Sequence, residues 1–411
     1  MLVHSRPLRL KPPKKAWDTG QYGFNLAALE LGPIAMATKL ICALCPVELT
    51  DENRTKEHII PNSIGGMEKV EWFICRSCNS DKGETWDAAL AAQFNWFSVM
   101  VGIVRDRKES PPERVATISG EEFLLHPDGT MRPAKFKYEE VKDGETTRIS
   151  FAARTPREAR KKISEIAKRF PQIDQTEALA NTKAQNNYLN EPLKVDIQFG
   201  GPLAGRSVVK TALAFAVKNG IDPHSCESVF EFLHDDSAPP FCYGLSYLVD
   251  IVNTRPANTV FHCVAVHGSK VDGKLLGYVE YFGLARWLIL LSDNYDGPDL
   301  DEAYAMNPMT GDSIEIDLLW QLSAEVIDET IGGNGYSQKS YMEAIERTMD
   351  IVMRISNERG TNNAFKESFI AAGKKLELKP GDIIGPAQSQ EFAKAIVEGL
   401  TPYLLHRLGI K

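Results

Sequence analysis

Two Cys-x-x-Cys pairs near the start of the chain constrain its fold more than any other feature. Cys42 and Cys45 form the first pair, and Cys75 and Cys78 form the second. Four cysteines in two such pairs are the ligand set of a tetrahedral structural zinc site, which leaves no coordination position for water. The ion would hold two segments together in a module too small to bury much apolar surface. The spacing therefore predicts a zinc-held scaffold and says little about a reaction.

The residues between the two pairs point to chemistry. Glu57 and His58 lie in a strand-like stretch, Thr55–Ile60, which leads into a proline turn and a Gly-Gly break. Asn79 directly follows the second pair, where we expect a helix to begin. Zinc would then clamp this helix near the strand and bring together an imidazole, a carboxylate and an amide oxygen. Those are the groups that a hard divalent cation and a general base require.

This combination of Glu-His-Ile-Ile-Pro, Gly-Gly and Cys-x-x-Cys-Asn resembles the HNH endonuclease family, in its ββα-metal form with a four-cysteine zinc clasp; it spans residues 42–83. The resemblance implies that His58 deprotonates the attacking water. It also implies that Glu57 and Asn79 hold a catalytic Mg²⁺ or Mn²⁺ against the scissile phosphate of DNA. The products would carry 5′-phosphate and 3′-hydroxyl ends. Members of this family often serve in restriction or anti-phage defence.

The chain departs from the family pattern in one place. Many members have an asparagine between the Gly-Gly and the second cysteine pair, where it braces the loop that orients the histidine. The corresponding stretch here, Met67–Ile74, contains none. We expect Asn62 or a backbone carbonyl to provide the bracing. The alternative is a non-catalytic zinc module that binds nucleic acid or a partner, with His58 only packed.

Length and composition predict a globular protein of two or three domains. The 411 residues are 43% hydrophobic and 25% charged, and no apolar run approaches the roughly 20 residues of a membrane span. We expect an α+β chain: a basic arm and linker over residues 1–38, the HNH domain over 39–110, and a mixed α/β targeting or regulatory region over 111–411, with two subdomains split near 190 as an option. The cysteines outside the two pairs fit a cytoplasmic protein with buried, reduced thiols; they are Cys226, Cys242 and Cys263.

The net charge of −8 makes the basic patches informative, because phosphate contacts supply much of the affinity of a DNA-binding protein. One patch is Met1–Lys15, and the other is Arg154–Arg169, on an expected helix. We expect the second patch to contact the DNA backbone; the alternative is a solvated helix face. The residues chosen for this contact are Arg157, Arg160, Lys161 and Lys162.

Gly200–Ser207 has the spacing of a phosphate-binding P-loop, but with Arg206 where a lysine is expected. A glycine turn that leads into a helix explains the same residues without a nucleotide. Arg206 at the helix start is nevertheless a candidate DNA-phosphate contact. A second alternative is therefore a nuclease effector gated by a small nucleotide ligand. Because one site is visible, cutting both strands of DNA would require a homodimer or two successive events.

Periodicity and turn signals predict the elements that follow the cysteine module. We expect helices at Trp86–Val104, from Pro156 with Thr155 or its neighbour as the cap, and at Ser207–Lys218, Tyr341–Ile355, Asn363–Lys374 and Gln390–His406. We expect a small antiparallel sheet within Val115–Ala153, a strand at Leu193–Phe199, a hairpin of Thr259–Val266 with Leu275–Phe282, and a strand at Trp287–Leu291.

Overall fold

The structure, a computed structural model, describes residues 39–106, 109–144, 146–182, 188–379 and 381–410. The basic arm expected over Met1–Lys15 lies outside these residues. Residues Leu40–Lys411 form one compact unit, held together by the contacts between its residues. No helix in the described part of the chain combines the length and apolar character needed to cross a bilayer.

The first elements form the expected ββα arrangement. Strand β1 (Arg54–His58) pairs antiparallel with β2 (Lys69–Cys75), and the loop between them contains a short 3₁₀ turn, η1 (Asn62–Ile64). Helix α1 (Arg76–Lys82) begins directly after β2. This order confirms a ββα module at the two cysteine pairs.

A single turn of π-helix, η2 (Gly83–Asp87), connects α1 to α2 (Ala88–Val101). Gly102 ends α2 in a left-handed conformation, with φ 73°, which glycine adopts at little cost. The helix expected over Trp86–Val104 is therefore confirmed, although it ends earlier than predicted.

The largest sheet is antiparallel and has six strands in the order β14-β13-β10-β11-β12-β9. The expected hairpin is confirmed as β10 (His262–Ser269) with β11 (Lys274–Tyr281), and the expected third strand is part of β12 (Ala285–Ser292). The outer strands are β9 (Tyr243–Leu245), β13 (Leu300–Met306) and β14 (Ser313–Ile314).

Alternating side chains of the central strands enter two different cores. On β10, Val264 and Val266 belong to the larger core, whereas Cys263 and Ala265 belong to the smaller core on the other face. This is the period of two that a sheet buried on both faces requires.

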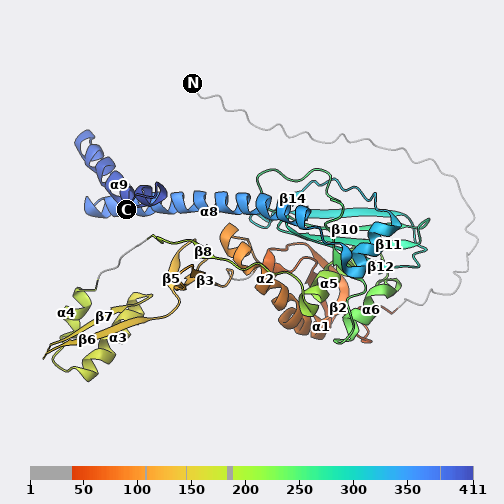
Figure 1. The fold of residues 1–411 in the computed structure, drawn as a ribbon, viewed down its shortest axis with the longest axis horizontal. Helices are drawn as coiled ribbons and strands as arrows, with labels where there is room; N and C mark the ends of the chain where they lie inside the picture. Colours follow the sequence, from red (N-terminus) through yellow and green to blue (C-terminus); the bar gives the residue numbers. More distant parts are fainter. Residues whose placement is uncertain (1–38, 107–108, 145, 183–187, 380, 411) are drawn as a thin grey trace, which may run out of the picture. The chain divides into compact units, whose positions relative to one another are not determined.

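Helix α5 (Pro202–Lys218) lies between the large sheet and the ββα module. It packs on β10, β11 and β12 on one side and on β2, η2 and α2 on the other (Figure 1). Its contact with the sheet is close, since a Cβ on Gly277 of β11 would lie 2.7 Å from the Cβ of Ala212. Helix α5 begins earlier than the predicted Ser207, because Gly201 with φ 85° turns the chain and Pro202 occupies the first helical turn.

One apolar core joins these layers. It includes Ile59 of the ββα module, Phe94 of α2, Val209 of α5 and Tyr281 of β11. The rings of Phe94 and Tyr281 meet edge to face, with centroids 5.6 Å apart. The core thus runs through the expected domain boundary at residue 110.

The segment expected to form one small sheet contains two. Strands β3 (Glu113–Thr117), β4 (Glu122–Leu125) and β5 (Met131–Pro133) form a sheet with β8 (Leu193–Lys194), while β6 (Lys137–Asp143) forms a two-stranded sheet with β7 (Thr146–Ala152). The prediction of a strand over Leu193–Phe199 was wrong beyond its first two residues. The backbone of Gly200 instead pairs with the side-chain amide of Gln93, with N···O distances of 2.6 and 2.9 Å.

The remaining helices follow the sequence pattern with one exception. Thr155 caps α3 (Pro156–Arg169) as predicted, by accepting a hydrogen bond from the Glu158 amide. The two helices expected at 341–355 and 363–374 are one continuous helix, α8 (Gln338–Lys375), which packs against α9 (Pro386–Arg407). The other short helical elements are α4 (Gln175–Ala180), η3 (Pro223–Ser225), η4 (Glu227–Val229), α6 (Phe230–His234), α7 (Ala324–Glu329) and η5 (Thr330–Asn334).

Candidate active site

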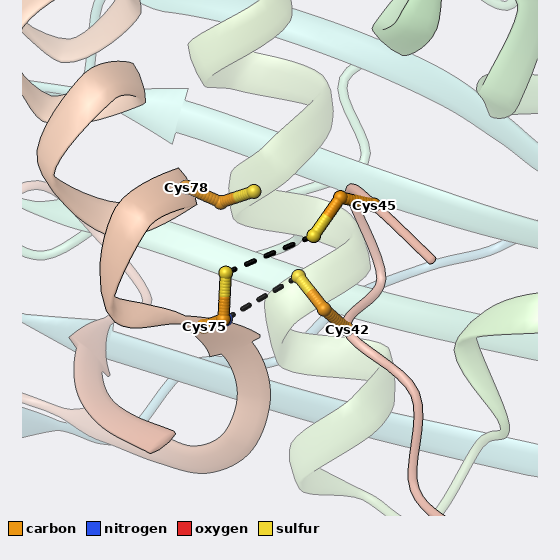
Figure 2. A group of neighbouring side chains, drawn as sticks. All are labelled: Cys42, Cys45, Cys75 and Cys78. Atoms are coloured by element: carbon orange, nitrogen blue, oxygen red, sulfur yellow. Dashed lines mark hydrogen bonds between the residues drawn. The ribbon is translucent and has the colours of Figure 1, made fainter. Parts of the chain in front are cut away.

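The four predicted cysteine ligands converge. Figure 2 shows Cys42 and Cys45, from the loop before β1, pointing toward Cys75 and Cys78 at the junction of β2 and α1. All four sulfur atoms lie within 4.8 Å of one another, and those of Cys45 and Cys75 are 3.7 Å apart. A zinc–sulfur bond of about 2.3 Å puts two ligands of a tetrahedron roughly 3.8 Å apart. The donor set and its spacing therefore fit zinc.

Backbone contacts hold this cluster on the hairpin. The Cys75 amide donates to the sulfur of Cys42 at 3.3 Å, and the Ala43 amide donates to the carbonyl of Phe73 at 3.0 Å. Burial raises the pKa of the Cys42 thiol to about 11. A bound cation would offset this cost and keep the sulfur as a thiolate at neutral pH.

The loop between β1 and β2 is shaped by two glycines and one asparagine. Gly65 has φ +101°, and a Cβ on Gly66 would lie 1.8 Å from the Ile60 carbonyl oxygen. Asn62 donates its side-chain amide to the Gly66 carbonyl at 3.0 Å. Asn62, one of the two groups that we considered for bracing this loop, thus forms a hydrogen bond across it.

His58, at the end of β1, has a carboxylate partner that the sequence did not indicate. Its Nε2 atom lies 3.0 Å from Oδ2 of Asp106, a residue in the segment that follows α2. Lys69 also donates to this Asp106 oxygen, at 2.5 Å. Because a carboxylate only accepts hydrogen bonds, this contact assigns the proton of the neutral ring to Nε2 and leaves Nδ1 basic.

The surroundings of His58 favour its neutral form. Burial lowers the pKa of His58 below its ordinary value of 6.5, the hydrogen bond to Asp106 raises it, and the charge of Lys69 lowers it. Burial is the largest of these effects, so the pKa of His58 is lowered overall. At pH 7 the ring is therefore unprotonated at one nitrogen, as a general base must be.

Glu57 and Asn79 meet directly. The Asn79 Nδ2 donates to Oε2 of Glu57 at 2.6 Å and to the hydroxyl of Thr55 at 3.1 Å. These contacts use the amide nitrogen, so Oδ1 is the Asn79 atom that would bind a cation. Burial raises the pKa of Glu57, and the neighbouring Lys210 ammonium opposes that shift.

A cavity of about 750 Å³ opens over these residues, and Glu57, His58 and Asn79 all line it. Four further charged side chains on its wall were not predicted: Asp87, Arg105, Glu113 and Arg114. The Nε of Arg105 is buried and meets no hydrogen-bond partner among the described residues. The cavity thus combines a base, carboxylates and two arginines.

Lys210 is a further residue that the sequence analysis did not select. It lies on α5, is 1% exposed, and donates to Glu57 at 2.5 Å and to Asp87 at 2.7 Å. A lysine within the apolar stretch of this helix was the signal available in the sequence, since lysine is rarely buried without a partner. Its partner Glu57 could not be inferred, because the two lie far apart in the chain.

The predicted phosphate contact of Arg206 is not supported by its position. The side chain is 1% exposed, and its guanidinium donates to the carbonyls of Phe232 and Asp235 at 2.8 and 2.7 Å. Its guanidinium therefore satisfies backbone oxygens of α6 and of the residue that follows it, and almost none of the side chain faces solvent. Because Arg206 is buried, it also does not take the position of a P-loop lysine, whose side chain contacts a bound phosphate.

The predicted DNA-contacting residues of α3 lie mainly on the surface. Arg157, Arg160 and Lys161 are exposed, whereas the half-buried Lys162 pairs with Glu165 at 3.1 Å. The Lys162 ammonium also lies 5.1 Å from the centre of the Phe136 ring. The structure does not place these residues with the cavity-lining group.

Comparisons with known proteins bear on the ββα module. Neither the search of curated proteins nor the search of solved structures found a match. Residues 42–95, which contain the four-cysteine cluster, His58, Asn79 and the first turns of α2, match the model of a protein family described as HNH endonuclease. This segment of the chain thus resembles the HNH endonuclease family, and the resemblance is limited to it.

Proposed function

We propose that the protein is a metal-dependent endonuclease that hydrolyses phosphodiester bonds of DNA. The observation that carries this proposal is the shared cavity of Glu57, His58 and Asn79, beside a cysteine cluster that fits zinc. A zinc module that only binds nucleic acid has no need of a half-buried histidine aligned by a carboxylate. The family match of residues 42–95 supports the same reaction class.

His58 is the general base in this proposal. Its Nδ1 takes a proton from the attacking water, while Asp106 accepts the hydrogen bond from Nε2 and stabilises the imidazolium that forms. The new oxygen–phosphorus bond forms as the bond from phosphorus to the 3′ oxygen breaks, and the leaving 3′ oxygen takes a proton from solvent water. The products then carry a 5′-phosphate and a 3′-hydroxyl.

Glu57 and Asn79 are the proposed ligands of the catalytic cation, Mg²⁺ or Mn²⁺, because they supply carboxylate and amide oxygens at the cavity wall. When bound, such a cation stabilises the charge that develops on the phosphate and on the leaving oxygen. Zinc, held by the four cysteines, has a structural role.

The arginines of the cavity are the proposed contacts to the scissile strand. Arg105 and Arg114 line the same wall as the catalytic residues, and the planar guanidinium suits phosphate recognition. The α3 residues Arg157, Arg160, Lys161 and Lys162 are proposed as more remote backbone contacts.

Plasmid cleavage in Mg²⁺ tests the catalytic assignment. We expect His58→Ala to lose about 10²–10⁴-fold in rate, the usual contribution of a general base, with zinc content and circular dichroism unchanged. His406→Ala is a matched control, because His406 is exposed on α9. Equal cutting by His58→Ala and wild type would contradict the assignment. DNA binding without any Mg²⁺-dependent cleavage would favour the non-catalytic zinc module.

The α3 proposal has a separate test. In a variant with glutamine at the four basic residues of α3, the slope of log Kd against the logarithm of the salt concentration should become smaller. The decrease should be up to about 0.9 for each phosphate that the variant no longer neutralises. An unchanged slope would assign these residues to a solvated helix face.

A further inference from the structure

A buried ammonium from outside the HNH segment lies against the proposed catalytic carboxylate. The Lys210 side chain is 1% exposed, and its Nζ donates to Oε1 of Glu57 at 2.5 Å and to Oδ2 of Asp87 at 2.7 Å. Lys210 belongs to α5, whereas the segment that matches the HNH family ends at residue 95. The matched segment therefore does not contain all the groups that contact its own acidic residue.

The Glu57 carboxylate is held at both oxygens. Oε1 accepts from Lys210, and Oε2 accepts from the Asn79 amide at 2.6 Å. Two donors on opposite oxygens define the plane of the carboxylate. Each oxygen keeps a further lone pair, so this arrangement orients Glu57 without excluding a cation.

Asp87 and Ser207 hold the ammonium in place. Asp87 accepts from Lys210 through Oδ2 and from the Ser207 hydroxyl through Oδ1, at 2.6 Å. Ser207 lies on the same side of α5 as Lys210, one helical turn earlier. Since α5 is itself packed between the large sheet and the ββα module, the ammonium is fixed by a rigid element rather than by a mobile loop.

The charges of this group are complementary to a divalent cation. Two carboxylates and one ammonium carry a net charge of −1, and both carboxylates line the cavity. The Lys210 Nζ bridges the carboxylates of Glu57 and Asp87. Without this ammonium, the two negative charges would repel each other in a site of low polarity. The lysine lets both remain at the wall.

We propose that Lys210 is a positioning residue of the nuclease site: it orients the Glu57 carboxylate toward the cavity, with Asp87 and Ser207 as its anchors. This inference rests on the proposed function, in which Glu57 is a ligand of the catalytic cation. It also means that α5 completes the site, so the region beyond residue 110 contributes to catalysis as well as to targeting or regulation.

Lys210→Met tests the proposal, because it keeps the length of the side chain and removes the charge. We expect cleavage to fall roughly 10- to 100-fold, the usual effect of losing a partner of a metal ligand. Titration with Mn²⁺, followed by electron paramagnetic resonance, should show weaker binding. Removal of a positive charge would by itself strengthen the binding of a cation. Weaker Mn²⁺ binding therefore reports the loss of orientation.

A double-mutant cycle separates positioning from general stability. If Lys210 acts through Glu57, Lys210→Met should cost little further activity in a Glu57→Gln background. Thr211→Val is the matched control, because Thr211 is a buried polar residue of α5 that bonds Tyr281 and not the carboxylates. Ser207→Ala, which leaves the ammonium in place and removes one anchor, should give a smaller loss in the same direction.

Any of four outcomes would overturn the proposal: tighter Mn²⁺ binding by Lys210→Met, faster cleavage by Lys210→Met, additive losses with Glu57→Gln, or an unchanged rate per folded molecule. If wild type and His58→Ala are equally inactive, the proposed function fails instead. The Mn²⁺ titration of wild type and Lys210→Met would still test the positioning.

Discussion

Exchange of one cysteine of the cluster should release the metal and loosen the ββα module. Cys75 is the best position for this test, because it is buried at the end of β2 and begins α1. Its sulfur lies 3.7 Å from that of Cys45, and its amide bonds the sulfur of Cys42. Cys75→Ser therefore removes a ligand at the point where both cysteine segments meet the hairpin.

The expected effect is large compared with the stability of a domain. A structural zinc site contributes an apparent ~10–16 kcal/mol, and a whole domain is stable by about 5–15 kcal/mol. Even the lower value corresponds to a Kd of roughly 50 nM, so wild type should keep its zinc through dialysis. Loss of that contribution should unfold β1, β2 and α1 locally, while the second core on the far face of the large sheet persists.

Two measurements check this prediction. Elemental analysis should find one zinc per wild-type chain and clearly less in Cys75→Ser. Hydrogen exchange should show weaker protection of the β1 and β2 amides in the variant. Cys226→Ser is the control, because Cys226 is equally buried but stands outside the cluster. A wild-type protein without zinc, or a Cys75→Ser protein with full zinc and unchanged protection, would refute the reasoning.

Four further predictions concern the residues that line the cavity and the loop between β1 and β2. The acidic limb of the pH–rate profile should lie below pH 6.5, because burial lowers the pKa of His58 and a nearby cation would lower it further; a limb well above pH 6.5 would contradict this. Asp106→Asn removes a contact that raises this pKa, so the limb should move to lower pH while the rate falls, and a shift to higher pH would count against the His58–Asp106 pair. Gly66→Ala should abolish cleavage yet retain zinc, since its Cβ would lie 1.8 Å from the Ile60 carbonyl oxygen; activity measured beside zinc content decides this. Arg105→Gln should weaken DNA binding and reduce its salt dependence, and unchanged binding isotherms would exclude Arg105 from the DNA contact.

Features set by neighbouring residues could be predicted from the sequence. The cysteine pairs, the ββα order and the approach of Asn79 to Glu57 all lie within residues 42–79, where strand pairing and one helix start determine which side chains meet. The hairpin of β10 and β11 was predictable for the same reason, since its turn connects strands that are adjacent in sequence.

Features that depend on packing between distant segments could not be predicted. The periodicity of α5 identified a helix but could not show that it would be buried on both sides, so Arg206 was interpreted as a surface contact. The short strand β8 illustrates the same limit, because Gln93 replaces a neighbouring strand as the partner of Gly200.

The sequence alone predicted a zinc-held HNH module with Glu57, His58 and Asn79 as its candidate catalytic residues. Only the tertiary structure decided what orients them: Asp106 on His58, and Lys210 with Asp87 on Glu57. The physical reason is that a buried charge requires a partner of opposite charge. The partner is selected by how helices and strands pack, and the local sequence carries no record of it.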